Sequence, residues 1–259
     1  MKLHSRIRGE GAPVVLLHGL FGDGDNLTKL ALALSERYQV HSLDARNHGR
    51  SPRSAQHNYP LMVADLIEYL DAQSLESVRI VGHSMGGKTA MLSCLSHPDR
   101  FEQAVIADIA PVTYPPHHQQ IFKALESVNL NEIKSRAEAE RSMSDYLDDP
   151  MGKQFLLKSL TRTHDGGYDW RFNLDVLIDQ YEEILTGQPE TMTNDLPILF
   201  IAGGDSDYIQ REYVAGIQHR FPNASFKLIS GTGHWLHAEK PETFNGLVMR
   251  FFQNRADMR

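Results

Sequence analysis

The stretch Gly82-His83-Ser84-Met85-Gly86 has the form G-x-S-x-G. It stands between an apolar run, Val78 to Val81, and a segment that favours a helix, Lys88 to Ser96. Between a strand and a helix, this pattern predicts a nucleophile elbow, a sharp turn that presents a serine hydroxyl. Small residues two positions before and after the serine let the two backbones approach closely. We therefore expect Ser84 to be a nucleophile; a glycine-rich turn without chemistry is the alternative.

Short apolar runs alternate with helix-period segments on both sides of this turn, which is the pattern of parallel strands joined by crossover helices. Apolar residues recur at helical spacing in three segments, 27–34, 63–70 and 244–251. The sequence therefore predicts an α/β fold, with a mostly parallel twisted sheet flanked by helices. The expected strands are Val14 to His18, Val40 to Asp44, Arg79 to Gly82, Ala104 to Asp108, Pro197 to Gly203 and Phe226 to Ser230.

The alternation stops between Pro111 and Pro189, where helical segments occur and no strand is convincing. One segment, 174–181, has a clear amphipathic face, and the charge-rich stretch 131–149 is expected to be a solvated helix. An insertion that begins where the parallel strands end should fold back over that edge of the sheet. The expected organisation is a core from residues 1–110 and 190–259, with residues 111–189 inserted between two core strands as a helical cap.

Composition and charge exclude several classes of protein. The chain has 259 residues, and 26 Lys plus Arg against 33 Asp plus Glu give a net charge of -7, which argues against a nucleic-acid partner. The single cysteine, Cys94, cannot form an intrachain disulfide or a cysteine-based metal site. No apolar run reaches the ~18 residues of a membrane span, and the first ten residues lack a secretory signal. We expect a cytoplasmic protein without a membrane partner; its oligomeric state is left open.

A serine hydroxyl needs a base to take its proton, and His234 is the candidate. It follows the apolar run Phe226 to Ser230 through Gly231-Thr232-Gly233, late in the chain. His237 completes a His-x-x-His pair, but no third ligand follows at suitable spacing. The sequence therefore predicts neither a metal site nor a cofactor.

Two loops offer the acid that would orient His234. Asp207 follows the expected strand Pro197 to Gly203, whereas Asp108 ends the strand that follows the nucleophile strand. Both positions are geometrically credible, and Asp205 is a weaker third candidate. An acidic residue at a strand end also commonly caps a turn, so at least one of the two main candidates has that role.

Acyl transfer also needs hydrogen-bond donors for the developing oxyanion, and backbone amides supply them. The amide of Met85, directly after Ser84, is one expected donor. The loop His18-Gly19-Leu20 follows the first expected strand and supplies the second, which we assign to Leu20.

Seven stretches of the chain together resemble an α/β-hydrolase, and more narrowly the small cap-bearing esterases of the YbfF type. The resemblance covers nearly the whole chain, and the motifs at 108–112, 154–159 and 170–173 are its most specific parts. The residues that carry it are Val15 to Gly22, Asp44 to Gly49, Gly82 to Lys88, Asp108 to Val112, Gln154 to Ser159, Trp170 to Asn173 and Gly233 to Pro241.

The resemblance implies a serine esterase that hydrolyses short- to medium-chain carboxylic esters, with acyl thioesters such as acyl-CoA as further candidates. It also implies that the acid is Asp108. In the resulting mechanism Ser84 attacks the acyl carbonyl, His234 takes the proton, and water resolves the acyl-enzyme. Phe21 and Trp235 are candidates for the acyl pocket. The alternatives are a non-hydrolytic enzyme on this fold that cleaves carbon–carbon bonds or eliminates, and a non-catalytic binding protein.

Overall fold

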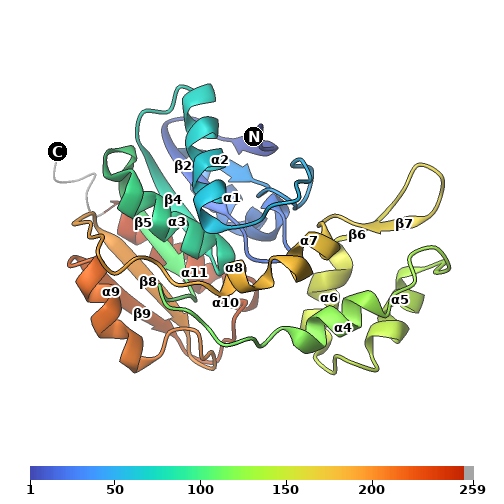
Figure 1. Ribbon diagram of the computed structural model, residues 1–259. Helices are drawn as coiled ribbons and strands as arrows, with labels where there is room; N and C mark the ends of the chain where they lie inside the picture. The colour runs from blue at the N-terminus through green and yellow to red at the C-terminus, as the bar shows by residue number, and fades with distance from the viewer. Residues whose placement is uncertain (254–259) are drawn as a thin grey trace.

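A seven-stranded sheet forms the centre of the computed structural model, which describes residues 1–253 (Figure 1). The strand order is β1-β3-β2-β4-β5-β8-β9, and every neighbouring pair is parallel except β1 with β3. The predicted mostly parallel sheet is therefore confirmed. Its strands are β1 (Ser5–Arg8), β2 (Ala12–Leu17), β3 (Tyr38–Leu43), β4 (Val78–His83), β5 (Phe101–Ala107), β8 (Ile198–Gly203) and β9 (Ala224–Ile229).

Helices cover both faces of the sheet because successive strand residues point to opposite faces. In β2, Val15 and Leu17 pack in one core cluster with α2, α3 and α9, whereas Val14 and Leu16 pack in the other with α1 and α11. No helix within residues 1–253 is long and apolar enough to cross a membrane. The helices of the core are α1 (Thr28–Leu34), α2 (Tyr59–Ala72), α3 (Met85–Ser96), α9 (Val214–Arg220), α10 (Leu236–Glu239) and α11 (Pro241–Gln253), with 3-10 turns at Gly24–Leu27, Pro98–Arg100 and Arg211–Tyr213.

The inserted segment, residues 111–189, connects β5 to β8. Its helices α4 to α6 and its hairpin lie together beside the sheet in Figure 1. A third apolar cluster joins Phe122, Trp170 and Leu177 of this segment to Leu20 and Phe21 of the core. The elements of the segment are α4 (Gln119–Glu126), α5 (Arg136–Met143), α6 (Pro150–Lys158), β6 (Leu160–Arg162), β7 (Tyr168–Trp170), α7 (Leu174–Asp179) and α8 (Tyr181–Leu185).

The expectation of a purely helical insertion was wrong, because β6 and β7 pair as a short antiparallel hairpin. With three residues each, these strands are too short to show a period of two in the sequence. The charge-rich stretch 131–149 contains only the eight-residue α5, and the segment 174–181 is divided between α7 and α8 at Gln180. The strand β1 was also missed, since its four residues lie at the sheet edge and none is buried.

Three successive backbone carbonyls at the end of α8 accept hydrogen bonds from the core. The Tyr59 hydroxyl donates to the Ile184 carbonyl at 2.7 Å, and Lys88 Nζ donates to the Leu185 and Thr186 carbonyls at 2.8 and 2.5 Å. Lys88 belongs to α3, one turn after Ser84, and only 1% of it is exposed. Burial lowers the pKa of Lys88 to about 7. The returning end of the inserted segment is therefore fastened to the nucleophile helix by a buried amine.

We expect Lys88→Met to lower the free energy of unfolding by about 1–3 kcal/mol, because one buried and one partly buried carbonyl lose their donor. The pKa of Lys88 is lower in the folded chain, near 7, than in the unfolded chain, so the unfolded chain binds more protons above pH 7. The free energy of unfolding of the wild type should therefore rise as the pH rises from 7 toward 10, because of the shifted pKa of Lys88. The Lys88→Met variant should lack that rise. Urea denaturation at pH 7 and pH 9 measures both effects.

The exposed residue Lys29 provides a matched control, because Lys29→Met removes a lysine without removing a buried donor. That variant should follow the wild type at both pH values. Equal stability of Lys88→Met and wild type at both pH values would contradict the anchoring role of Lys88.

Candidate active site

Ser84 lies on a sharp turn between the end of β4 and the start of α3. Its backbone has φ 53° and ψ -120°, a strained conformation for a residue with a side chain. A Cβ on Gly82 would lie 2.3 Å from the Gly86 carbonyl oxygen, and a Cβ on Gly86 would lie 2.4 Å from the Leu17 carbonyl oxygen. Only glycine fits at these two positions, so the sequence permits the turn that presents the Ser84 hydroxyl.

His234 lies in the loop between β9 and α10 and bridges two side chains. Its Nε2 is 2.9 Å from Ser84 Oγ, and its Nδ1 is 2.8 Å from Asp108 Oδ2. A carboxylate oxygen only accepts, so Nδ1 carries the hydrogen and Nε2 presents a lone pair to the Ser84 hydroxyl. The structure thus joins a hydroxyl, an imidazole and a carboxylate in the order that lets the imidazole take the serine proton.

Asp108 follows β5 and has no exposure to solvent. Its Oδ1 accepts a hydrogen bond from the Gly203 amide at 2.9 Å, and its Oδ2 accepts from the Ser206 hydroxyl as well as from His234. Asp205 and Asp207, the other acids considered, are both exposed. Of the three acidic residues, the structure brings Asp108 to His234.

Two residues of the β8–α9 loop that the sequence analysis missed also contact this group. Ser206 donates to Asp108, and the ring of Tyr208 stacks on His234 with centroids 4.0 Å apart and planes 22° apart. The Tyr208 hydroxyl lies 2.6 Å from His117 Nε2. Ser206 and Tyr208 flank Asp207, which is exposed, whereas both of them are partly buried. The sequence carries no signal for these two residues, because the loop after β8 has no regular period.

Two histidine side chains form hydrogen bonds that hold the loop after β2. His18 Nδ1 donates to the Gly19 carbonyl at 2.8 Å, and its Nε2 accepts from the Ala45 amide at 3.0 Å. The Phe21 amide donates to His48 Nε2 at 3.2 Å, which removes it from the candidate oxyanion donors. The two expected donors belong to Leu20, in this loop, and to Met85, the first residue of α3; both residues are buried in one apolar cluster.

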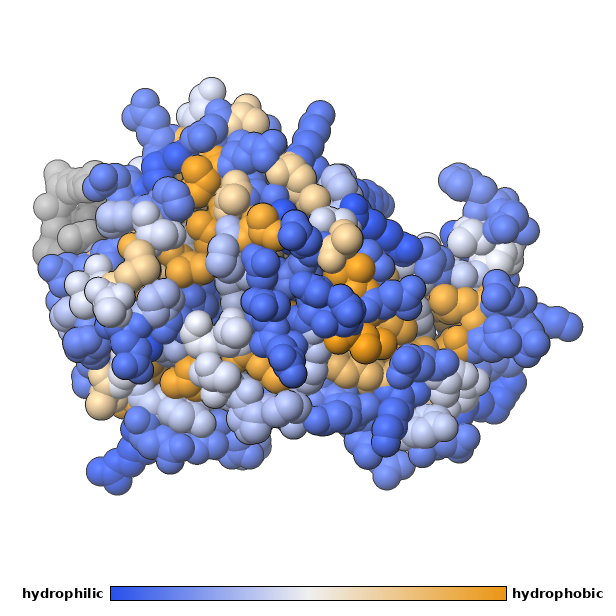
Figure 2. Space-filling model, in the orientation of Figure 1, coloured by the Kyte–Doolittle hydropathy of each residue, from blue (hydrophilic) through white to orange (hydrophobic). Residues whose placement is uncertain are grey.

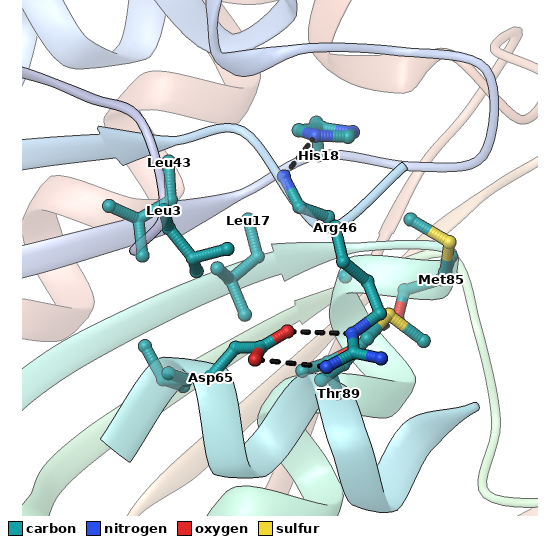
Figure 3. Close-up of a pocket in the computed structure, with 12 residues that line it drawn as sticks. Leu3, Leu17, His18, Leu43, Arg46, Asp65, Met85 and Thr89 are labelled. Carbon is teal, nitrogen blue, oxygen red and sulfur yellow. Dashed lines mark hydrogen bonds and ion pairs between the residues drawn. The ribbon is translucent and has the colours of Figure 1, made fainter. Parts of the chain in front are cut away.

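A buried ion pair between Arg46 and Asp65 lies next to the residues that His18 contacts at the base of this loop. Arg46 Nε and Nη2 lie 2.7 and 3.0 Å from the two carboxylate oxygens of Asp65, beside a small cavity lined by His18 and Met85 (Figure 3). Bidentate pairs of this kind fix geometry as well as contribute energy. Because His18 accepts from the amide next to Arg46, the pair fastens the base of the loop to α2.

The Ser84 hydroxyl and His234 open into a pocket between the core and the inserted segment, whose enclosed volume is about 60 Å³. Phe21 and Trp235, the two residues expected in an acyl pocket, both line it. Figure 2 shows hydrophobic residues on the visible face near α6 and α7, where the inserted segment meets the core. The remaining lining residues are Gly19, Leu20, His83, His118, Ile121, Leu147, Asp149, Gly152, Phe155 and Leu156.

Within residues 1–253, no three histidine, cysteine, aspartate or glutamate side chains gather in a way that would hold a metal ion. His237, the second member of the His-x-x-His pair, is buried against His83 and Phe244. Burial lowers its pKa to about 3, with His234 and Lys158 adding to the shift, so its ring is neutral at ordinary pH.

The sequence matches the family described as "Alpha/beta hydrolase family" over residues 14–247. It is 41% identical over 244 residues to esterase YbfF of Escherichia coli, covering 94% of each chain. It is 38% identical to the mouse sn-1-specific diacylglycerol lipase ABHD11, covering 92% of this chain and 80% of the relative. A solved structure described as a marine microorganism esterase matches with a TM-score of 0.94 and 40% identity, covering 96% of this chain and 99% of that one.

We expect Asp108→Asn to lower kcat for p-nitrophenyl butyrate by about 10⁴-fold, as the same change does in the best-studied triad, because the wrong His234 tautomer results. Asp207→Asn should leave kcat within about twofold, since its exposed carboxylate does not contact His234. Steady-state kinetics of both variants measure the difference. A dead Asp207→Asn enzyme beside an active Asp108→Asn enzyme would contradict the assignment of the acid.

Proposed function

This chain belongs to the alpha/beta hydrolase family and is a carboxylic ester hydrolase, and we propose that its reaction runs through an acyl-enzyme on Ser84. The observation that carries the proposal is the continuous hydrogen-bonded chain from Ser84 through His234 to Asp108. An isolated serine hydroxyl is a weak nucleophile, and a hydrogen-bonded base activates it.

In the proposed acylation step, Ser84 Oγ forms a bond to the ester carbonyl carbon while its proton passes to His234 Nε2. The imidazolium that forms is stabilised by the Asp108 carboxylate at 2.8 Å from Nδ1. The amides of Leu20 and Met85 hold the carbonyl oxygen as it becomes negative. The carbon–oxygen bond to the alcohol then breaks, and His234 returns the proton to the leaving oxygen.

In the proposed deacylation step, water takes the place of the alcohol. His234 Nε2 accepts a proton from this water as its oxygen bonds to the acyl carbon, and the tetrahedral intermediate collapses to the free acid. The proton returns to Ser84 Oγ, so the enzyme is regenerated without a metal or cofactor taking part in this scheme. Ser84 stands at the N-terminus of the twelve-residue α3, whose backbone dipole adds to the stabilisation of negative charge there.

Ser206 and Tyr208 have supporting roles in this scheme. Ser206 supplies one of the three hydrogen bonds that satisfy the buried Asp108 carboxylate, which would otherwise be costly to keep ionised. Tyr208 covers one face of the His234 ring, so the ring is shielded from water on that side.

The pocket supports short- to medium-chain acyl groups as the substrate class. Its apolar wall, including Phe21, Ile121, Phe155 and Trp235, suits an alkyl chain. The enclosed volume beside Ser84, about 60 Å³, favours short chains over long ones. Ile121 and Phe155 come from α4 and α6, which supports residues 111–189 acting as a cap over the site. Acyl thioesters such as acyl-CoA fit the same mechanism, since only the leaving atom changes.

We expect hydrolysis of p-nitrophenyl acetate, butyrate and octanoate, with palmitate the poorest substrate because the enclosed space beside Ser84 is small. Ser84→Ala should lower kcat by at least about 10⁴-fold for every ester, since removal of a triad nucleophile costs even more in a well-studied case. Stopped-flow or steady-state release of p-nitrophenol measures both.

The matched control is Ser93→Ala. Ser93 is a buried serine of the same helix, and its hydroxyl donates to the Thr89 carbonyl rather than to a residue of the site. It should keep wild-type kcat. Thermal melting shows whether Ser84→Ala stays folded. Full activity of a folded Ser84→Ala protein would contradict the mechanism, and a preference for palmitate would contradict the substrate class.

A further inference from the structure

His83, the residue between Gly82 and the nucleophile, has no role in the mechanism above, although it contacts three parts of the site. It is the last residue of β4 and only 4% exposed. Its Nε2 lies 2.8 Å from the main-chain carbonyl oxygen of His234. Its ring packs against the rings of His234 and His237, with centroids 4.7 and 4.5 Å apart.

The ring of His83 also lies against the loop that carries the proposed oxyanion donor. A methyl group on Gly19 would lie 2.9 Å from His83 Nδ1 and 3.2 Å from Ser84 Cβ. Only glycine lets the loop come so close to the elbow. One imidazole therefore touches the nucleophile turn, the oxyanion loop and the loop of the catalytic base.

The hydrogen bond fixes the chemical form of His83. A carbonyl oxygen only accepts, so Nε2 carries the hydrogen and donates it to the His234 carbonyl. Burial lowers the pKa of His83 well below its usual value, and the neighbouring His237 and His234 add to the shift. A neutral ring is what the site requires, because a second cation 4.7 Å away would oppose the imidazolium that forms on His234.

The position of the His234 imidazole depends on both its side-chain and its main-chain contacts. Asp108 holds Nδ1 of the ring, and His83 holds the carbonyl of the backbone from which the ring projects. The preceding residues Gly231 and Gly233 make this loop tolerant of backbone rotation, and Gly231 has φ 62°. Without the bond from His83, a small rotation of the backbone would move Nε2 away from Ser84 Oγ.

We propose that His83 is a positioning residue that sets the distance between His234 Nε2 and Ser84 Oγ. It does so by donating a hydrogen bond to the main-chain carbonyl of His234, and its ring also packs against Gly19. The inference rests on the proposed function, in which His234 is the base. It assigns to the His83 hydrogen bond a contribution to kcat rather than to substrate binding, because the bond acts on the base. His83 also lines the pocket, and the similar volume of Met retains that packing in His83→Met. A displacement of about 1 Å in such a group is enough to cost about 10²-fold in rate.

Three substitutions separate the hydrogen bond from simple packing. His83→Met fills a similar volume without a donor. His83→Gln places an amide N–H close to the position of Nε2, and His83→Asn carries the same amide one methylene short of it. We measure kcat and KM for p-nitrophenyl butyrate, with a thermal melt of each variant.

We expect His83→Met and His83→Asn to lower kcat by about 10²-fold with KM within about twofold, and His83→Gln to recover most of the loss. A wild-type kcat in His83→Met, or a His83→Gln enzyme no better than His83→Asn, would overturn the inference. If His83→Met does not fold, the comparison of His83→Gln with His83→Asn still decides, because both carry the same polar group.

His219→Gln serves as the control, since His219 is an exposed histidine of α9 outside the site. Ser84→Ala in the same assay separates the two proposals. An active Ser84→Ala enzyme would defeat the proposed function itself. An inactive Ser84→Ala enzyme together with wild-type kcat in all three His83 variants would defeat only the inference about His83.

Discussion

Asp108 is a carboxylate with no exposure to water, and the structure around it follows from the need to satisfy that charge. Burying an unpaired carboxylate is prohibitive, so each of its oxygens must receive donors. The Gly203 amide comes from the end of β8, the Ser206 hydroxyl from the loop that follows it, and His234 from the loop after β9. The three partners meet Asp108 because β5, β8 and β9 are neighbours and parallel, so that their carboxyl ends lie at one edge.

Two residues at this edge of the sheet have strained backbone conformations. Ser84 and Asp108, which follow the adjacent strands β4 and β5, both have positive φ, and each such residue costs about 1–3 kcal/mol. The two apolar clusters that clamp the sheet from both faces hold these turns in place. The site therefore combines strained turns with rigid strands. Together they keep the Ser84 hydroxyl, the His234 ring and the Asp108 carboxylate within hydrogen-bonding distance.

The sequence carries some of these features more clearly than others. Strands β2, β4 and β5 are largely buried, so they read as apolar runs, and Ser84 follows β4 directly. His234 follows β9, an edge strand that is only partly buried, after four intervening residues. The choice between Asp108 and Asp207 depends on which carboxylate turns toward His234. Asp108 follows β5 and Asp207 lies in the loop after β8, so both sit near strand ends in the sequence. The contacts of Ser206 and Tyr208 likewise depend on the backbone path of the loop after β8. The hairpin β6–β7 is too short for a period, and the break at Gln180 leaves the apolar spacing of 174–181 intact.

The central claim is a covalent acyl-enzyme, and the partition of that intermediate between water and a second nucleophile tests it most directly. We would hydrolyse the p-nitrophenyl, phenyl and ethyl esters of butyric acid in a fixed concentration of methanol and measure the ratio of methyl butyrate to butyric acid. A common acyl-enzyme on Ser84 predicts one ratio for all three esters, because the leaving group has departed before the nucleophiles compete. A ratio that changes with the leaving group would contradict the account.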